Sequence, residues 1–473
     1  MAFQAPCSII AAVGDGMHTT TGVSGKFFSA LGDAKINVLA ISQGSSERNI
    51  SAVVLESEST RALRAVHAAF RLSETTVRIG IVGINDIGIS LLQLLQSQKD
   101  KLKNTFDIDL QVVSVLPSAE SKTFVTLKHQ TTDTSISYFS YNHASDSDEV
   151  QLVEGDLTQF KDSVISEDTV HSVIFDCTAD ETVGNQHISW LRSGIHVVTA
   201  NNTALSGSRD VRKKIRRFYQ KKYLCEVTVG GGLPIISTLR DLLHSGDSIQ
   251  QMDGILSVSM SYIMHRISPP PGAQECQMFD ATHIIKNDTN TEPIKLSQAL
   301  KEAMELGLTE DDPSRDIHNE FTARCLMVLA NELGLDALHS IESIQEHSDK
   351  IVDNFCGEIT EEMDEHIATR VREASAKKCV LRHVSRVDVK TGNVSIQILE
   401  VPNTHVFATT PPSNECVRFF THRHSQYPLI IQGPSAGTDS TASALLAEVL
   451  HLMKHKRSET GMISRTTSST MLL

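Results

Sequence analysis

The spacing of hydrophobic residues near the N-terminus predicts a small sheet covered by two helices. Residues 7–13, 36–41 and 49–55 form short apolar runs typical of strands, whereas residues 22–31 and 59–70 carry apolar positions at helical spacing. The resulting β-α-β-β-α order fits a ferredoxin-like unit, in which both helices pack on one face of an antiparallel sheet. The sequence therefore predicts a small, separate domain at the start of the chain.

From residue 77 onward, strands alternate with helices. Extended apolar runs lie at residues 78–82, 110–115, 173–177 and 195–199, and a polar, Ser- and Asp-rich excursion around residues 118–149 separates the second run from the third. Strands that alternate with helical stretches predict a parallel sheet of the nucleotide-binding kind. Ligand sites of such sheets lie at the carboxyl ends of the strands.

We therefore expect an α/β protein with three domains and a tail. The small domain spans residues 1–75, a Rossmann-type domain spans 77–225, and an α+β domain spans 226–454 with its last part returning to the nucleotide domain. A Pro-rich segment opens a polar stretch at about 268–292, which we interpret as an inserted loop. Residues 455–473 are rich in Ser, Thr, Lys and Arg, and are expected to form a disordered tail.

The charge balance excludes whole classes of partner. The chain has 43 lysines and arginines against 57 acidic residues, and a net charge of −14 argues against a nucleic-acid-binding surface. No stretch reaches the roughly 20 apolar residues of a membrane span, and there is no signal-peptide pattern. The eight cysteines have no zinc or disulfide spacing, which indicates reduced thiols in a cytoplasmic compartment, or in a plastid if a leader was removed.

The N-terminal domain carries a family resemblance in three segments. They are CSIIAAVGDGM from Cys7, GVSGKFFSAL from Gly22 and INVLAISQGSSERNIS from Ile36. Over residues 7–72 they resemble the last ACT repeat of aspartate kinases, and most closely that of fused aspartokinase–homoserine dehydrogenases. No kinase domain precedes this module, so aspartate phosphorylation is not expected.

The resemblance implies two roles for the ACT-like module. A small amino-acid ligand would lie at the turn of residues 14–16, where amide dipoles at a helix start favour a carboxylate, and Gln43 would sense the effector. The alternative is a module that binds nothing and only pairs with another ACT domain, in a homo-oligomer or with a full-length paralogue. We expect a homo-oligomer, because an open-edged small sheet with the apolar helix face of Val23, Phe27, Phe28 and Leu31 gains stability by pairing.

Further segments resemble homoserine dehydrogenase, in that family's order and over almost the whole chain. They are GIVGINDIG from Gly80, DCT from Asp176 with HVVTANNT from His196, EVTVGGGLPII from Glu226 with GILS from Gly254, GLTEDDPSRD from Gly307 and GPSAGTDSTA from Gly433. The resemblance implies a body that interconverts L-homoserine and L-aspartate 4-semialdehyde with NADP or NAD. That reaction belongs to the pathway of the aspartate-family amino acids threonine and methionine.

The dinucleotide-binding turn departs from the family pattern. Such a turn uses three glycines, and here Gly83 and Gly88 keep the sharp turn and the packing while Asn85 occupies the place where pyrophosphate approaches most closely. No acidic residue or arginine ends the second strand to contact a ribose. We expect cofactor binding to be weak or lost, and a turn kept for packing alone is an equal alternative. The implied cofactor contacts are Gly83, Asn85, Ile87, Gly88, Thr178, Asn202 and Gly437.

The proton-accepting groups of the family are replaced. Oxidising an alcohol needs a group that takes the hydroxyl proton, and a lysine on a buried helix suits this role because burial lowers its pKa. By resemblance this lysine falls on Cys325, its aspartate partner on Phe321 and a second lysine on Asn202. A thiolate at Cys325 would need a positive neighbour, and Arg324 points away along the helix. We therefore expect Cys325 to be a buried, inert thiol, and the ring of Phe321 to be buried.

Two other parts of the implied site remain in the sequence. Glu310, which contacts the substrate amine in the family, and Asp316 are expected to bind substrate. A loop that resembles the family's sodium site uses mostly backbone carbonyls, and we expect it to bind a monovalent cation. Its ligands are Glu226, Val229, Gly231 and Leu233.

Three hypotheses follow for the whole chain. The first is a catalytically impaired paralogue kept for assembly or amino-acid sensing, and the second is an active NAD(P)-dependent homoserine dehydrogenase with a rearranged site. The third is a degenerate product of a once-fused gene without a selected role. We favour the first, because each positioned proton-transfer group is worth roughly 10²–10⁴-fold in rate and several are replaced together.

Overall fold

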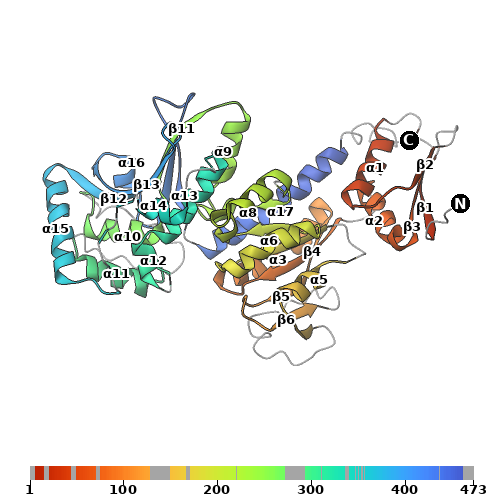
Figure 1. Ribbon diagram of the computed structural model, residues 1–473, viewed down its shortest axis with the longest axis horizontal. Coiled ribbons are helices and arrows are strands. Elements are labelled where there is room, and N and C mark those ends of the chain that lie inside the picture. Colours follow the sequence, from red (N-terminus) through yellow and green to blue (C-terminus); the bar gives the residue numbers. More distant parts are fainter. Residues whose placement is uncertain are drawn as a thin grey trace, which may run out of the picture.

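The computed structural model describes most of the chain. The described residues are 6–14, 17, 21–43, 49–70, 75–127, 150–166, 171–219, 221–271, 293–310, 312–335, 340–346, 348–349, 351–352, 355, 357–435 and 437–461. Most of the expected inserted loop and of the polar excursion thus lies outside the described residues. The rest of the chain builds three sheets, one in each domain, with the N-terminal module at one end of the molecule (Figure 1).

The N-terminal module has the expected ferredoxin-like order. Its elements are β1 (Cys7–Val13), α1 (Val23–Asp33), β2 (Ala40–Gln43), β3 (Asn49–Leu55), a short 3₁₀ turn η1 (Glu56–Glu58) and α2 (Ser59–Ala69). The strands pair antiparallel in the order β1-β3-β2. The second strand starts four positions later than the hydrophobic run beginning at Ile36, whose side chain is instead buried in the core under the helices.

Among the described residues of this module, apolar side chains are exposed on the open face of its sheet. The helix residues Phe27 and Leu31 are fully buried against their own sheet. On the other face, Ile9 is 71% exposed and Val13 is 78% exposed, and Val53 lies opposite Ile9 in the register. The apolar helix face therefore forms the module's own core, with Val23 and Phe28 partly buried against it, and ACT-mediated pairing stays a prediction.

The nucleotide domain is a seven-stranded sheet in the order β10-β9-β8-β4-β5-β6-β7. Its strands are β4 (Thr75–Val82), β5 (Ile108–Leu116), β6 (Thr123–Leu127), β7 (Val150–Glu154), β8 (His171–Asp176), β9 (His196–Thr199) and β10 (Tyr223–Leu224). Its helices are α3 (Asp86–Phe106), α5 (Leu157–Val164), α6 (Glu181–Arg192), α7 (Thr203–Ser206) and α8 (Arg209–Lys214), the last continued by a π-helical turn η2 (Ile215–Tyr219). Five strands run parallel, as expected for this domain.

The sheet is mixed and not wholly parallel. Strands β6 and β7 add to its edge in antiparallel register. Strand β6 falls in the polar excursion, and Phe124 on it is buried against Phe160 of α5, with ring centroids 5.9 Å apart. A short strand with one large anchoring side chain is therefore enough to extend the sheet here.

The third domain is built on a five-stranded antiparallel sheet in the order β13-β12-β11-β14-β15. Its strands are β11 (Ile249–Ile255), β12 (Cys379–Asp388), β13 (Asn393–Pro402), β14 (Asn414–Thr421) and β15 (Leu429–Pro434). Its helices and turns are η3 (Glu226–Thr228), α9 (Ile235–His244), α10 (Val258–Ile267), α11 (Leu296–Glu305), α12 (Pro313–Ile317), α13 (Glu320–Glu332), α14 (Ile341–Glu346), α15 (Glu361–Ala376) and α16 (Val406–Thr409). The α+β expectation for this domain is confirmed.

The final helix α17 (Thr438–Gly461) returns to the nucleotide domain and packs along α3 (Figure 1). The Ser90 hydroxyl on α3 donates to the Asp439 carboxylate at the start of α17, at 2.6 Å. The helix continues to Gly461, so the first part of the expected disordered tail is helical, and residues 462–473 lie outside the described residues. None of the described helices has the length and apolar character of a membrane span.

Candidate functional site

The two remaining glycines of the β4–α3 turn are required by packing. Gly83 has a φ of +92°, and a Cβ built there would lie 2.8 Å from the methyl carbon of Thr178. A Cβ on Gly88 would lie 2.0 Å from the carbonyl oxygen of Gly83. Both distances are shorter than real contacts, so the strand and helix approach each other only because these two side chains are absent.

Asn85 occupies the start of α3 with its side chain turned back onto the protein. Its Oδ1 accepts a hydrogen bond from the Gly88 N–H at 3.1 Å, and its Nδ2 donates to the Cys177 carbonyl at 2.7 Å. The N-terminus of a helix is where a Rossmann-type turn presents N–H groups to pyrophosphate. In this chain one of those N–H groups already has an internal acceptor, which Asn85 supplies as an N-cap.

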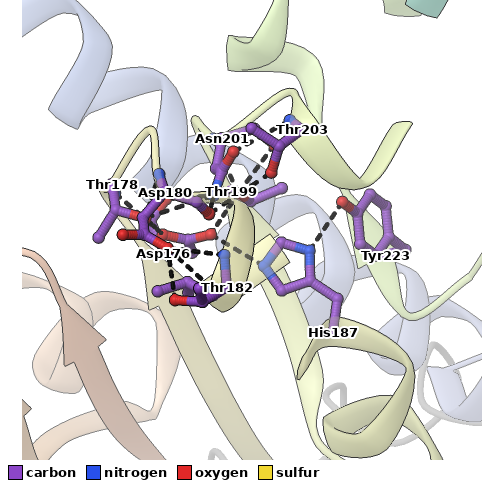
Figure 2. Close-up of polar contacts among 10 residues, drawn as sticks. Asp176, Thr178, Asp180, Thr182, His187, Thr199, Asn201, Thr203 and Tyr223 are labelled. Carbon is purple, nitrogen blue, oxygen red and sulfur yellow. Dashed lines mark hydrogen bonds and ion pairs between the residues drawn. The ribbon is translucent and has the colours of Figure 1, made fainter. Parts of the chain in front are cut away.

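A buried network holds the neighbouring strand ends together (Figure 2). Asp176, at the end of β8, accepts from the main-chain N–H and the hydroxyl of Thr178 at 2.9 and 2.7 Å. Its other carboxylate oxygen lies 2.9 Å from Nε2 of His187, whose Nδ1 lies 3.0 Å from the Tyr223 hydroxyl. Asn201 after β9 donates to the Thr178 hydroxyl at 3.3 Å. Thr178 is therefore placed at the cofactor edge, with its polar groups already engaged by the protein.

The structure brings Cys325 and Asn202, the two positions where the resemblance places lysines, close together. Asn202 Nδ2 lies 3.9 Å from the Cys325 sulfur, and the thiol donates to the Thr228 carbonyl at 3.7 Å. Cys325 is 1% exposed, and burial, with Glu415 as a further cause, raises the pKa of its thiol far above the ordinary value. The expected burial of the Cys325 thiol is confirmed, and its inertness stays a prediction.

Asp316 shapes the loop that carries Glu310. Its Oδ2 accepts from the Glu310 main-chain N–H at 2.9 Å and its Oδ1 accepts from the Ser259 hydroxyl at 2.6 Å. Burial raises the pKa of Asp316 above its ordinary value. Both carboxylate oxygens thus have protein donors, so Asp316 positions Glu310 in the substrate-side loop.

A cavity of about 50 Å³ lies between the β9 edge and the Glu310 loop. Residues that line it include Asn201, Asn202, Glu310, Arg315, Phe321 and Arg324. The expectation that Phe321 is buried was wrong, because its side chain is 37% exposed and forms part of this wall. Of the residues expected at the substrate site, Glu310, Asn202 and Phe321 therefore line one cavity, whereas Asp316 and Cys325 are not among the described residues that line it.

Sequence reasoning missed the two arginines of this cavity. Arg315 makes a two-pronged contact with Glu320, at 2.9 Å for each pair, and lies 3.8 Å from the Glu310 carboxylate. Arg324 pairs with the same Glu320 at 2.6 Å. Arg315 stands in the segment GLTEDDPSRD that carried the resemblance, and its placement directly before Asp316 was the available signal. The cavity thus keeps one carboxylate and two guanidinium groups but has no lysine among the described residues that line it.

The loop expected to bind sodium is present as one tight turn. The Glu226 carboxylate accepts from the N–H groups of Ile236 and Ser237 at 2.9 and 2.8 Å, at the start of α9. Gly231 has a φ of +55°, and a Cβ there would lie 2.4 Å from the Ser435 carbonyl. The Glu226 side chain is therefore a helix cap, and a cation bound here would rely on main-chain carbonyls such as those of Val229 and Gly231.

The expected effector residue, Gln43, is the last residue of β2 and is exposed. Residues 15–16 and 44–48, which would complete a ligand site beside it, lie outside the described residues. The role of Gln43 in effector sensing stays a prediction.

Three family models match successive parts of the chain. The ACT domain model matches residues 10–70, the NAD-binding domain model of homoserine dehydrogenase matches residues 83–224, and the homoserine dehydrogenase model matches residues 234–450. The chain therefore contains an ACT domain and an NAD-binding domain, in the order that the sequence predicted.

Curated relatives agree with these matches. The chloroplastic bifunctional aspartokinase/homoserine dehydrogenase 2 of Arabidopsis thaliana is 35% identical over 467 residues, covering 95% of this chain and 46% of that protein. The bifunctional enzyme of Haemophilus influenzae is 30% identical and is covered to 51% of its length. The homoserine dehydrogenase of Emericella nidulans is 30% identical over 298 residues, covering 60% of this chain and 76% of that protein. The chain spans about half the length of the bifunctional relatives that it matches.

Solved structures show the same fold. A Candida auris protein of unknown function is 27% identical with a TM-score of 0.65, covering 80% of this chain and 98% of that one. A hyperthermophilic archaeal homoserine dehydrogenase in complex with NADPH is 18% identical with a TM-score of 0.57, covering 80% of this chain and 98% of that one. At 18% identity, the similarity to the archaeal homoserine dehydrogenase supports the fold only.

Proposed function

The chain belongs to the homoserine dehydrogenase family, and from that premise we propose that it is a catalytically impaired member, acting in regulation or assembly. It is a homoserine dehydrogenase-like protein of the aspartate-family amino-acid pathway. The impairment is the proposal, and it concerns the proton-transfer step and the approach of the cofactor.

The contact between Cys325 and Asn202 carries this proposal. A dehydrogenase must remove the proton of the substrate hydroxyl as hydride leaves, and the base needs a pKa near the working pH. At this place the chain has a thiol whose pKa is raised by burial and a neutral amide 3.9 Å from it. Neither group accepts a proton at neutral pH, and the loss of one such group typically costs roughly 10²–10⁴-fold in rate.

The Asn85 cap supports weakened binding of NADP or NAD. Pyrophosphate gains most from the unoccupied N–H groups of a helix start, and Asn85 Oδ1 already accepts from Gly88. We expect Asn85→Gly to bind NADPH at least several-fold more tightly than the natural chain, because it removes both the side chain and the internal acceptor. Isothermal titration of both proteins with NADPH measures this, and equal affinities would mean that Asn85 does not obstruct the cofactor.

One assay tests the proposed function as a whole. The purified protein is incubated with L-homoserine and NADP at neutral pH, and NADPH formation is followed by absorbance. The proposal expects turnover far below that of an ordinary homoserine dehydrogenase assayed in parallel. Turnover at the ordinary rate would overturn it in favour of an active enzyme with a rearranged site.

The regulatory part of the proposal rests on the ACT domain. We assign it the binding of a small amino acid, or pairing with a second ACT domain of the same chain or of a full-length paralogue. The exposed apolar face around Ile9 and Val13 supports pairing. Absence of any amino-acid binding together with a monomeric mass would leave the hypothesis of a degenerate gene product.

We also propose that the turn after η3 binds a monovalent cation such as sodium. Main-chain carbonyls of the turn are hard oxygen ligands, and this ligand type tolerates changes of side chain elsewhere in the site. Binding to the folded state alone raises the melting temperature. Melting temperatures in sodium and in tetramethylammonium chloride at equal ionic strength are the measurement, and identical values would remove the cation from the proposal.

A further inference from the structure

The cavity beside β9 is bordered by a row of alternating charges. The Arg315 guanidinium lies between two carboxylates: its Nε and Nη2 each donate to Glu320 at 2.9 Å, and its Nη1 lies 3.8 Å from the Glu310 carboxylate. Arg324 extends the row by pairing with the same Glu320 at 2.6 Å. The two guanidinium groups and the two carboxylates therefore carry no net charge together.

The backbone fixes Arg315 and Glu310 beside each other. Arg315 lies on α12, and the next residue, Asp316, accepts the main-chain N–H of Glu310 at 2.9 Å. Asp316 is buried and is itself held by the Ser259 hydroxyl at 2.6 Å. The Glu310 loop and the Arg315 helix thus share one buried anchor, so the guanidinium group and the Glu310 carboxylate stay close in the absence of a ligand.

Arg315 also keeps its positive charge at this place. The hydrogen bonds to Glu320 raise the pKa of Arg315 above its ordinary value, and the same bonds lower the pKa of the Glu320 carboxyl. The side chains of Arg315 and Glu310 are 38% and 34% exposed, so water screens their attraction. Water would screen the attraction between Glu310 and a ligand ammonium in the same way. An ammonium group that approaches Glu310 therefore competes with a cation that is already in position.

The cavity offers an amino group no other carboxylate. Glu310 is the only acidic residue among the described residues that line it. An ammonium group loses hydration when it enters a cavity, and only a charged partner compensates for this loss. The polar lining residues Asn201 and Asn202 are neutral amides, and Asn201 Oδ1 already accepts from the Thr203 N–H at 3.0 Å. Arg315 thus offsets the one negative charge in the lining that would attract an amino group.

We propose that Arg315 determines the specificity of this cavity by cancelling its preference for an α-ammonium group. The inference rests on the proposed function, which places the substrate beside Asn202 and Glu310. The cavity then accepts a short hydroxy acid whether or not it carries an amino group. In the natural chain, L-homoserine gains little over 4-hydroxybutanoate, which has the same carbon chain and hydroxyl group but no amino group.

Ligand-observed NMR titration of the full chain, without cofactor so that no reaction occurs, compares these two ligands. We expect their dissociation constants to agree within about twofold in the natural chain, and Arg315→Gln to prefer L-homoserine about tenfold or more. In this variant Glu320 keeps Arg324 as its partner, so the carboxylate that loses its cation is Glu310. A natural chain that prefers L-homoserine tenfold, or an Arg315→Gln chain without such a preference, overturns the proposal.

Three further variants assign the effect to the contact between Arg315 and Glu310. Arg315→Lys keeps the positive charge and should keep the natural ratio of affinities. Arg324→Gln removes the same charge from the same wall, but Arg324 pairs with Glu320, so the ratio should change by less than about threefold. An equal gain in Arg324→Gln and Arg315→Gln would assign the effect to overall charge and overturn the proposal. Adding Glu310→Gln to Arg315→Gln should remove the new preference, and a preference that persists would mean that another group receives the ammonium.

The binding ratio and the turnover assay can fail separately. A natural chain that turns over slowly yet prefers L-homoserine overturns the role of Arg315 and leaves the proposed impairment in place. Turnover at the ordinary rate overturns the proposed function itself, whatever the ratio of the two affinities.

Discussion

Glu448 is a partly buried carboxylic acid on the final helix whose Oε2 is shielded from solvent. It lies on α17, and its Oε1 accepts from the Glu226 N–H at 3.0 Å, while its Oε2 has no hydrogen-bond partner among the described residues. Burial, with the nearby charge of Glu226, raises the pKa of the Glu448 carboxyl to about 8. The carboxyl is therefore protonated in the folded chain at neutral pH.

This protonation predicts a pH dependence of stability. The folded-state pKa of about 8 exceeds the ordinary value of 4.5, so the folded chain binds more protons than the unfolded chain between these values. The contribution of Glu448 to the free energy of unfolding is therefore largest below pH 4.5 and falls as the pH rises through about 8. Glu448→Gln keeps the acceptor for Glu226 but cannot ionise, so its stability relative to the natural chain should rise with pH.

Urea unfolding of both proteins between pH 5 and pH 8.5 measures the difference, which should reach on the order of 1–3 kcal/mol at the alkaline end. Glu305→Gln serves as the control, because Glu305 is a surface residue whose side chain is 66% exposed. A Glu448→Gln difference that stays constant with pH would mean that the carboxyl ionises normally in the folded chain.

At the residue scale, the sequence correctly predicted the burial of Cys325 but not the exposure of Phe321. The spacing and the resemblance together placed Cys325 in the interior, and the structure confirms it at 1% exposure. They failed for Phe321, one helical turn earlier, which was expected to be buried and is 37% exposed. An apolar position on a helix reveals its face only when the neighbour that covers it is known, and here a cavity adjoins it.

At the scale of elements, hydrophobic periodicity predicted the strands of the first two domains well. The bounds of β1 and β3 agree with the apolar runs, because each strand has one face buried under helices. The prediction missed β6 and β7, which are short edge strands outside the parallel pattern. It also ended α17 too early, because its polar last turns have no hydrophobic stripe to mark them.

Helix α13 carries two of the positions at which the proposal of impaired catalysis can be tested. Phe321 and Cys325 lie one turn apart on it, and Asn202 faces Cys325 from the start of α7. Cys325→Lys, Phe321→Asp, Asn202→Lys and Asn85→Gly restore the base, its carboxylate partner, the second lysine and the glycine turn. We expect the quadruple variant to form NADPH from NADP and homoserine at least about 100-fold faster than the natural chain, and each single change to do little, because groups that act as a unit are non-additive.

Because Phe321 is partly exposed, Phe321→Asp should destabilise the fold less than the same change at a buried position. A carboxylate at a position 37% exposed keeps part of its hydration, and it can pair with the new lysine at i+4. The matched control carries the same three other changes with Cys325→Met, which adds similar bulk without an amine. Turnover that is equal in the control and the lysine variant would exclude the proposed base, and a folded, NADPH-binding quadruple variant without turnover would mean that the substrate pocket itself has changed.

At the scale of the whole molecule, three bodies with separate sheets lie in series, with the ACT domain at one end (Figure 1). The Lys35 side chain donates to the Arg192 carbonyl of the nucleotide domain at 3.0 Å. The open face of the ACT sheet, by contrast, exposes Ile9 and Val13 on alternate positions of β1. A small sheet that buries only one face and leaves branched apolar side chains on the other is typical of a surface that pairs with a second copy.

Substitution on this face predicts the oligomeric state. In a two-fold symmetric pair every changed residue occurs twice, so Ile9→Glu would bring two carboxylates into one apolar interface at a cost of several kcal/mol. We expect the natural chain to have at least twice the mass of a single chain by light scattering at micromolar concentration, and Ile9→Glu to shift it toward the single-chain mass. Leu63→Glu is the matched control, because Leu63 is 47% exposed on α2 and lies away from the open sheet face. The control should keep the larger mass.

A natural chain that is monomeric at this concentration would contradict ACT-mediated pairing. A larger mass that remains after Ile9→Glu would place the contact on another surface of the molecule.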